Sequence, residues 1–143
     1  MNKKILAVII AIVVIVGAIG VTAYQMLKTS PALITVTYQA PKASFNYIDQ
    51  SVAQVDYHTQ YYGWTTSMTF YVNFTSTKSA TLNIANFYLT YNGNTLPTIS
   101  HDSGTTSITG GYINPDLFTF ILEGNVTSYQ LAYHGSNVNI VEV

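Results

Sequence analysis

The chain has 143 residues, enough for one domain and a terminal segment, and it combines 48% hydrophobic with only 8% charged residues. Five lysines, no arginine and six acidic residues give a formal net charge of −1 at pH 7, and there is no cysteine. These totals exclude a nucleic-acid binder that meets phosphates with a basic surface, and they exclude disulfides, thiol catalysis and cysteine-ligated metals.

The first predicted element is an apolar stretch at residues 5–23, which contains no charged residue. As an α-helix it would be roughly 28 Å long, close to the ~30 Å hydrocarbon core of a bilayer. Lys3 and Lys4 precede it, which favours a cytoplasmic N-terminus and an exported remainder. Tyr24 and Lys28 follow it, where an interfacial aromatic residue and a snorkelling cation are expected. We therefore predict a transmembrane helix that contacts the lipid bilayer through residues 5–23.

Two other interpretations of this stretch stay open. The tripeptide that ends at Ala23 resembles a small-residue signal-peptidase site, so cleavage there would release the remainder. The same helix could instead pack against copies of itself in a filament. Pro31 ends any helix, because proline lacks the backbone donor and disfavours helix in the residue before it. The predicted organisation is thus an N-terminal hydrophobic helix, membrane anchor or signal sequence, over residues 1–28 and an extracellular domain over residues 29–143.

After Pro31 the hydrophobic period changes to two. Residues 67–76 alternate apolar and polar side chains, as a half-buried strand does. Asn92 to Asn94 predict a hairpin turn, since Asn and Gly tolerate positive φ, and Gly110-Gly111 predicts a second turn. The polar segment 100–107 is expected to be a loop. Further strands are predicted over residues 33–38, 80–84, 86–91, 117–122, 129–133 and 138–143, and over parts of 45–62.

The expected architecture is all-β. About seven to nine short strands with turns roughly every 8–12 residues, and no helical period, are typical of two packed antiparallel sheets. Twelve tyrosines suit such a fold, because the ring packs on a sheet while the hydroxyl reaches water. We therefore predict an Ig-like antiparallel β-sandwich preceded by one N-terminal hydrophobic α-helix.

Residues 69–143 contain Asn73 near the end of a predicted strand, then Phe87-x-Leu89, Phe120 and Tyr129-x-Leu131-x-Tyr133. With this order of motifs they resemble the Ig-like domains of immunoprotective-antigen type in prokaryotic surface lipoproteins. In that family a strand that ends in Asn precedes a Phe-x-Leu strand, then a Phe strand and a closing Tyr-x-Leu-x-Tyr strand. The resemblance implies a fold and an exterior location, and it brings no catalytic residue. The lipidated cysteine of that family is missing here, so a peptide helix would replace it. The matching positions are Asn73, Phe87, Leu89, Phe120, Tyr129, Leu131 and Tyr133.

The overall plan is similar to that of archaeal type IV pilins, in which an apolar helix runs directly into a Thr-rich β-domain. Those proteins are cut before the helix after Gly or Ala, whereas Lys4 stands at the corresponding position here. Cleavage after Ala23 allows a third arrangement, in which residues 24–38 insert as a donor strand into a neighbouring domain. The simpler expectation is that residues 33–38 pair within their own domain.

Candidate sites for chemistry are few. Asn73 and Asn125 each begin an N-glycosylation sequon. Asp56 with His58, and His101 with Asp102, place an imidazole near a carboxylate. No nucleophile motif or metal-ligand spacing accompanies either pair, so they are interpreted as turn formers and solvated residues.

Trp64 is the other residue singled out. It lies among Tyr61, Tyr62 and Gly63, and its indole would either stack on carbohydrate or, as we favour, pack in the core or shield a strand edge. We expect no catalytic residue, cofactor or metal site.

These observations predict a non-enzymatic, membrane-anchored surface or envelope protein with a structural or adhesive role, single-pass in a cell membrane or virion envelope with the C-terminal domain outside. The composition favours an archaeon or an archaeal virus as its source. We expect a homo-oligomer or contacts with other surface proteins, and no nucleic acid. The alternatives are a pilin-like or donor-strand subunit of an extracellular filament, and a secreted or tethered solute-binding protein or enzyme that uses the His101 loop.

Overall fold

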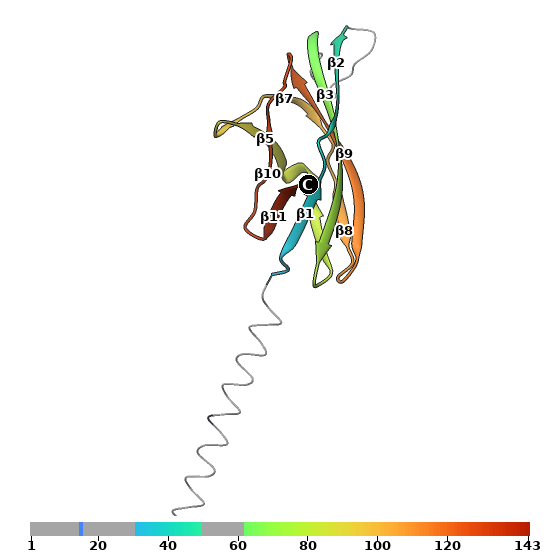
Figure 1. The fold of residues 1–143 in the computed structure, drawn as a ribbon, viewed down its shortest axis with the longest axis vertical. Helices are drawn as coiled ribbons and strands as arrows, with labels where there is room; N and C mark the ends of the chain where they lie inside the picture. The colour runs from blue at the N-terminus through green and yellow to red at the C-terminus, as the bar shows by residue number, and fades with distance from the viewer. Residues whose placement is uncertain (1–14, 16–30, 50–61) are drawn as a thin grey trace, which may run out of the picture. The chain divides into compact units, whose positions relative to one another are not determined.

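The computed structural model describes residue 15, residues 31–49 and residues 62–143. The chain divides into two units, Met1–Pro31 and Ala32–Val143, and all the strands described belong to the second unit. Most residues of that unit are in strands, which confirms the prediction of an all-β fold (Figure 1). The strands are β1 (Ile34–Tyr38), β2 (Lys42–Ile48), β3 (Gly63–Ser76), β4 (Ala80–Asn83), β5 (Phe87–Tyr91), β6 (Asn94–Thr95), β7 (Thr98–His101), β8 (Thr105–Ile108), β9 (Ile113–Glu123), β10 (Gln130–Tyr133) and β11 (Val138–Glu142).

The larger sheet is built on β3, and its strand order is β11-β1-β3-β9-β7 with β2 also paired to β3. On one side β3 pairs with β9 along nearly its whole length, from Thr65 opposite Glu123 to Thr75 opposite Ile113. On the other side β2 pairs with the N-terminal half of β3 and β1 with the C-terminal half. The length of β3, 14 residues, allows this central place, because one edge can pair with β9 while the other pairs with both β2 and β1. Alternation of its side chains turns the apolar residues from Met68 to Phe74 to one face.

The prediction of purely antiparallel pairing is wrong for one pair of strands. β1 and β11 run parallel, with Ile34 opposite Val138. The Ile34 amide donates a hydrogen bond to the Asn137 carbonyl at 2.9 Å, so the chain returns to the sheet beside the start of β1. β11 therefore begins where β1 begins and runs in the same direction. The same pairing confirms that β1 is held inside its own domain, since β3 and β11 occupy its two edges.

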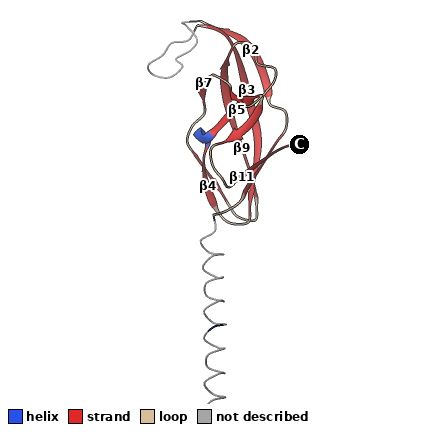
Figure 2. Cartoon of the chain, turned by 90° about the vertical axis from the view of Figure 1, so that its left-hand side faces the viewer, coloured by secondary structure: helices blue, strands red, loops and turns tan. Residues whose placement is uncertain are grey.

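The other described strands form two small sheets, β10-β5-β6 and β4-β8. The predicted turn between β5 and β6 is confirmed, with positive φ at Asn92 (50°) and Gly93 (79°). The predicted loop over residues 100–107 is wrong at both ends, because His101 ends β7 and Thr105 begins β8. The predicted strand over residues 80–84 ends one residue early, at the 3-10 turn η1 (Ile84–Asn86; blue in Figure 2).

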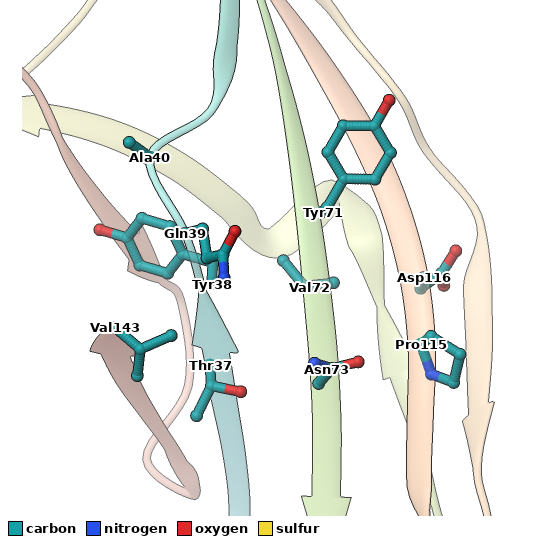
Figure 3. Close-up of a pocket in the computed structure, with 10 residues that line it drawn as sticks. All are labelled: Thr37, Tyr38, Gln39, Ala40, Tyr71, Val72, Asn73, Pro115, Asp116 and Val143. Carbon is teal, nitrogen blue, oxygen red and sulfur yellow. The ribbon is translucent and has the colours of Figure 1, made fainter.

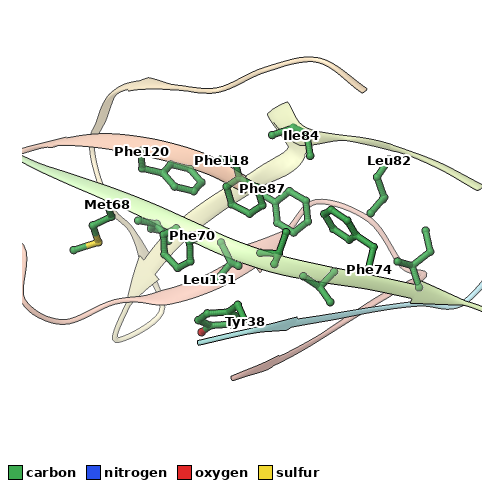
Figure 4. Packing of buried hydrophobic residues seen from close by; sticks show 14 of the residues in the cluster. Tyr38, Met68, Phe70, Phe74, Leu82, Ile84, Phe87, Phe118, Phe120 and Leu131 are labelled. Atoms are coloured by element: carbon green, nitrogen blue, oxygen red, sulfur yellow. The ribbon is translucent and has the colours of Figure 1, made fainter. Parts of the chain in front are cut away.

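One hydrophobic cluster joins the larger sheet to the two small ones (Figure 4). Phe118 of β9 stacks on Phe87 of β5 with ring centroids 4.8 Å apart, and Phe74 of β3 lies 6.2 Å from the same ring. These contacts bury the apolar faces that neither sheet could cover alone. The cluster contains alternate residues of β3 and β9, as expected for strands with one buried face: Met68, Phe70, Val72, Phe74, Phe118, Phe120 and Leu122.

The two ends of the β-domain differ, and we name them by their residues. The base comprises residues 31–35, the β3–β4 turn at 76–79 and the β8–β9 turn at 109–113, and it is the end at which the chain enters the domain. The tip comprises the end of β2, the start of β3 and the end of β9. Figure 1 shows β2 at one end of the domain and the β8–β9 connection at the other.

Candidate functional site

Two aromatic side chains of β2 contact Trp64 at the tip, and we call Phe45, Tyr47 and Trp64 the tip cluster. Trp64 stacks on Phe45 with ring centroids 4.8 Å apart and an interplanar angle of 19°. Tyr47 meets the same indole edge-on at 5.5 Å. The β2–β3 register sets these contacts, because Tyr47 lies directly opposite Trp64 and cross-strand partners share a face.

All three side chains of the tip cluster are exposed. Trp64 is 54% exposed although the alternation of β3 places it on the same face as the core residue Met68. Thr66, between them, explains the boundary: its hydroxyl donates to the Gly124 carbonyl at 2.6 Å and accepts from the Val126 amide at 2.9 Å. The chain after β9 therefore closes the core at Thr66 and leaves Trp64 outside it. The favoured prediction is core packing or shielding of a strand edge; core packing of Trp64 is wrong, and shielding of a strand edge stays a prediction.

The cluster is suited to contact and not to proton transfer. Its ring faces and edges offer dispersion and stacking interactions to sugars, aromatic side chains or other apolar groups. Only the Tyr47 hydroxyl and the Trp64 indole N–H add hydrogen-bonding capacity. Sequence reasoning named Trp64 but missed Phe45 and Tyr47, whose alternate spacing in β2 was the available signal.

The strand that displays the cluster is itself exposed. Every residue of β2 except Ile48 is exposed. Within the described residues β2 pairs with β3 alone, so its second edge offers backbone donors and acceptors. Lys42 is the one charged side chain in the strand.

The structure places His101 and Asp102 in supporting roles on the sheet. The His101 ring stacks on Phe120 at 5.6 Å, and its Nε2 lies 3.3 Å from the Ala85 carbonyl oxygen. The Asp102 carboxylate accepts the Thr119 amide at 2.9 Å. Both polar groups are thus engaged with neighbouring backbone. Among residues 31–49 and 62–143, no group of three or more His, Cys, Asp or Glu side chains could hold a metal ion; Asp56 and His58 lie outside the described residues.

The two sequon asparagines lie in different settings, and both are exposed. Asn125 follows the end of β9 in a loop. Asn73 lies in mid-β3, between Thr37 of β1 and Pro115 of β9, beside a notch of about 360 Å³ at the break between β1 and β2 (Figure 3). Among the described residues that line this notch, Asp116 is the one with a charged side chain.

The predictions for the N-terminal segment fall outside the described residues. They concern residues 5–23 apart from Ile15, the cleavage candidate Ala23 and the flanking residues Lys3, Lys4, Tyr24 and Lys28. In the part of the chain that the structure describes, no helix has the length and apolar character needed to cross a membrane.

Comparison of this chain with protein-family models, with curated proteins and with solved structures gives no match.

Proposed function

We propose that this chain is a non-enzymatic surface protein that a membrane holds through residues 5–23. Residues 29–143 form its exported domain, and the tip cluster is the surface that contacts other molecules. The role is structural or adhesive, at a cell membrane or virion envelope of an archaeon or an archaeal virus. The proposal gives the aromatic residues at the tip a function that does not need a reaction centre.

The observation that supports this proposal best is the placement of the two ends along one strand. The chain enters the domain beside Ser76, at the C-terminal end of β3, and Trp64 lies at its N-terminal end. Twelve residues of strand correspond to about 40 Å. A protein held at its base would present the tip cluster at that distance.

The arrangement of the three sheets relative to one another is also part of the proposal. We propose an Ig-like β-sandwich, in which the larger sheet packs on the two small ones. The stacking of Phe87 on Phe118 supports it, since the two rings come from different sheets. The resemblance to immunoprotective-antigen domains is consistent with the framework positions Leu89, Phe120 and Leu131, which are all buried.

Membrane residence is tested first. The full chain, produced with its N-terminus intact, is separated into soluble and membrane fractions, the membranes are washed with alkaline carbonate, and the intact mass is measured. Recovery in washed membranes with a mass that begins at Met1 supports the proposal. A monomeric full-length protein in the detergent-free cytosol contradicts it, and a mass that begins at Tyr24 indicates a secreted form.

The filament alternative has one structural observation in its favour: among the described strands, β2 pairs with β3 alone. A mass that begins at Ile5, together with filaments in sheared surface fractions seen by electron microscopy, would favour it. The solute-binding or enzymatic alternative depends on the His101 loop. Replacement of His101 and Asp102 with no loss of any measured activity would remove it.

A further inference from the structure

The base of the β-domain exposes three large hydrophobic side chains that adjoin one another. Leu33, Tyr112 and Ile113 are 63%, 69% and 69% exposed. They line the same shallow groove of about 490 Å³, together with polar residues of β1 and β3. Single exposed hydrophobic residues are normal, whereas a contiguous group marks a contact surface.

The turn that displays Tyr112 is fixed by hydrogen bonds. The Gly111 amide donates to the Ser76 carbonyl at 2.8 Å, which ties the β8–β9 turn to the end of β3. The Asn114 side-chain amide donates to the carbonyls of Thr109 and Tyr112, both at 3.1 Å. The exposed side chains therefore stand on a well-connected backbone, and burying them against the core would break these bonds.

The base also has a distinctive charge. A β-carbon at Gly110 would lie 2.6 Å from the Lys78 carbonyl carbon, so the turn that holds Lys78 packs directly against the β8–β9 turn. The residues that make up the base, 31–35, 76–79 and 109–113, contain this lysine and no Asp or Glu. A lysine at the same end of a domain as Tyr and aliphatic side chains is a composition found where proteins meet the lipid headgroup region.

The position of the base in the sequence indicates which partner the exposed side chains of the base contact. The apolar stretch ends at Ala23, ten residues before Leu33. Ten residues span at most about 36 Å, so a bilayer that held the stretch would lie within reach of the base. The start of β3 is about 43 Å further from the base along the strand.

We infer that Leu33, Tyr112 and Ile113 form a second membrane contact, which rests on the lipid interface beside the anchor. Tyr112 lies at headgroup level, and the two aliphatic side chains reach the acyl boundary. This contact fixes the base of the domain against the membrane and thereby aims the tip cluster away from it. The inference rests on the proposed function, because a domain without an anchor has no bilayer beside its base.

The absence of cysteine makes a site-specific test direct. Three single-cysteine variants of the full chain, Ile113→Cys, Leu117→Cys and Asn125→Cys, are labelled with an environment-sensitive fluorophore and reconstituted in phosphatidylcholine vesicles. All three positions are exposed. Leu117 is the matched control because it lies on the same face of β9, four residues after Ile113, which corresponds to about 13 Å along the strand. Nitroxide lipids then report how closely each label approaches the bilayer.

The expected result is strong quenching at position 113, weaker quenching at 117 and none at 125, with a several-fold rise in emission at 113 on reconstitution. Equal, water-like behaviour at 113 and 125 in protein that floats with the vesicles overturns the second contact and leaves the anchor intact. The label at position 113 could instead be shielded from water to an extent that rises with the protein-to-lipid ratio and does not respond to nitroxide lipids. That result also overturns the second membrane contact and favours contact between copies of the chain. Failure to float with vesicles refutes the anchor, and the inference fails with it.

Discussion

The Tyr38 hydroxyl donates a hydrogen bond to the Glu142 carboxylate at 3.3 Å, which connects the first strand of the β-domain to the last. The Tyr38 side chain is only 5% exposed, and its ring lies edge-on to Phe70 at 5.6 Å. Burial is the largest cause, and the neighbouring Glu142 carboxylate the second, of a rise in the pKa of Tyr38 to about 12. Burial also raises the pKa of Tyr129, again with a contribution from Glu142.

This pair predicts how stability depends on alkaline pH. Below pH 10 the Tyr38 hydroxyl is protonated in both folded and unfolded chains. Between about pH 10 and 12 the unfolded chain loses this proton first, so the free energy of unfolding falls by up to about 2–3 kcal/mol. Tyr38→Phe should make the fall shallower, with the part due to Tyr129 remaining. Urea unfolding by circular dichroism at pH 8, 10 and 11 measures this, and an unchanged pH profile would refute it; Tyr112→Phe is the exposed control.

The contact between sheets predicts a large effect of core truncation. Phe118 touches Phe70, Phe87 and Phe120 with ring centroids 4.8–5.8 Å apart. Phe118→Ala should lower the free energy of unfolding by about 3–5 kcal/mol, because it removes apolar contacts and leaves a cavity. Tyr71→Ala, on the exposed face of β3, should change it by about 0.5 kcal/mol or less. Equal costs for the two variants, measured by chemical denaturation, would contradict the described core.

Replacing either of two glycines with alanine should destabilise the domain, and the mechanism differs between them. Gly110→Ala should destabilise the domain by about 1–3 kcal/mol, since its β-carbon would lie 2.6–2.8 Å from the backbone of Lys78 and Ser79. Gly93→Ala meets no atom within 4 Å, but its φ of +79° costs about 1–2 kcal/mol in an L-residue. Thermal unfolding compares them. Because Gly93 has free space, Gly93→Asn should lose less than Gly93→Ala, and equal losses would count against backbone strain.

Trp64 is the single tryptophan and reports on the tip cluster. Phe45→Ala should shift its emission to the red and increase quenching by acrylamide, because one face of the indole loses its stacked partner. The cost in stability should be about 0.5–1.5 kcal/mol. Tyr71→Ala is the matched aromatic control and should leave the emission unchanged. Emission of the Phe45→Ala variant identical to that of the parent would contradict the stacking.

The sequons predict different occupancies in a host that glycosylates exported proteins. Asn125 should be modified more fully than Asn73, because it lies in a loop whereas Asn73 lies between two neighbouring strands of a sheet. Peptide mass spectrometry of the native protein measures both, and Asn125→Gln should remove most of the added mass. Greater occupancy at Asn73 would reverse this ranking.

Much of the fold is predictable from local pattern. Alternation along residues 67–76 identified both the strand and its buried face, because a side-chain period of two is a property of the strand itself. Asn92-Gly93 identified its turn for the same local reason, namely tolerance of positive φ. The sequence did not predict β8, because its four residues, three of them polar, are too few to show alternation. It exists because β4 offers a pairing partner.

The candidate sites depended more on tertiary structure. Alternation placed Trp64 on the same face as Met68, but only the bonds from Thr66 to the chain after β9 decide that the core ends between them. The base surface likewise unites Leu33 with Tyr112, 79 positions apart in the sequence.

The sequence by itself determined the all-β class, the strand faces and the division between an apolar N-terminal stretch and a polar, charge-poor remainder, because each follows from the order of neighbouring side chains. Only the tertiary structure decided that β1 runs parallel to β11, that the side chains of the tip cluster are about half exposed and that Tyr38 contacts Glu142. These features depend on contacts between residues far apart in the chain, and the packing of the whole domain selects among pairings that local periodicity leaves equivalent.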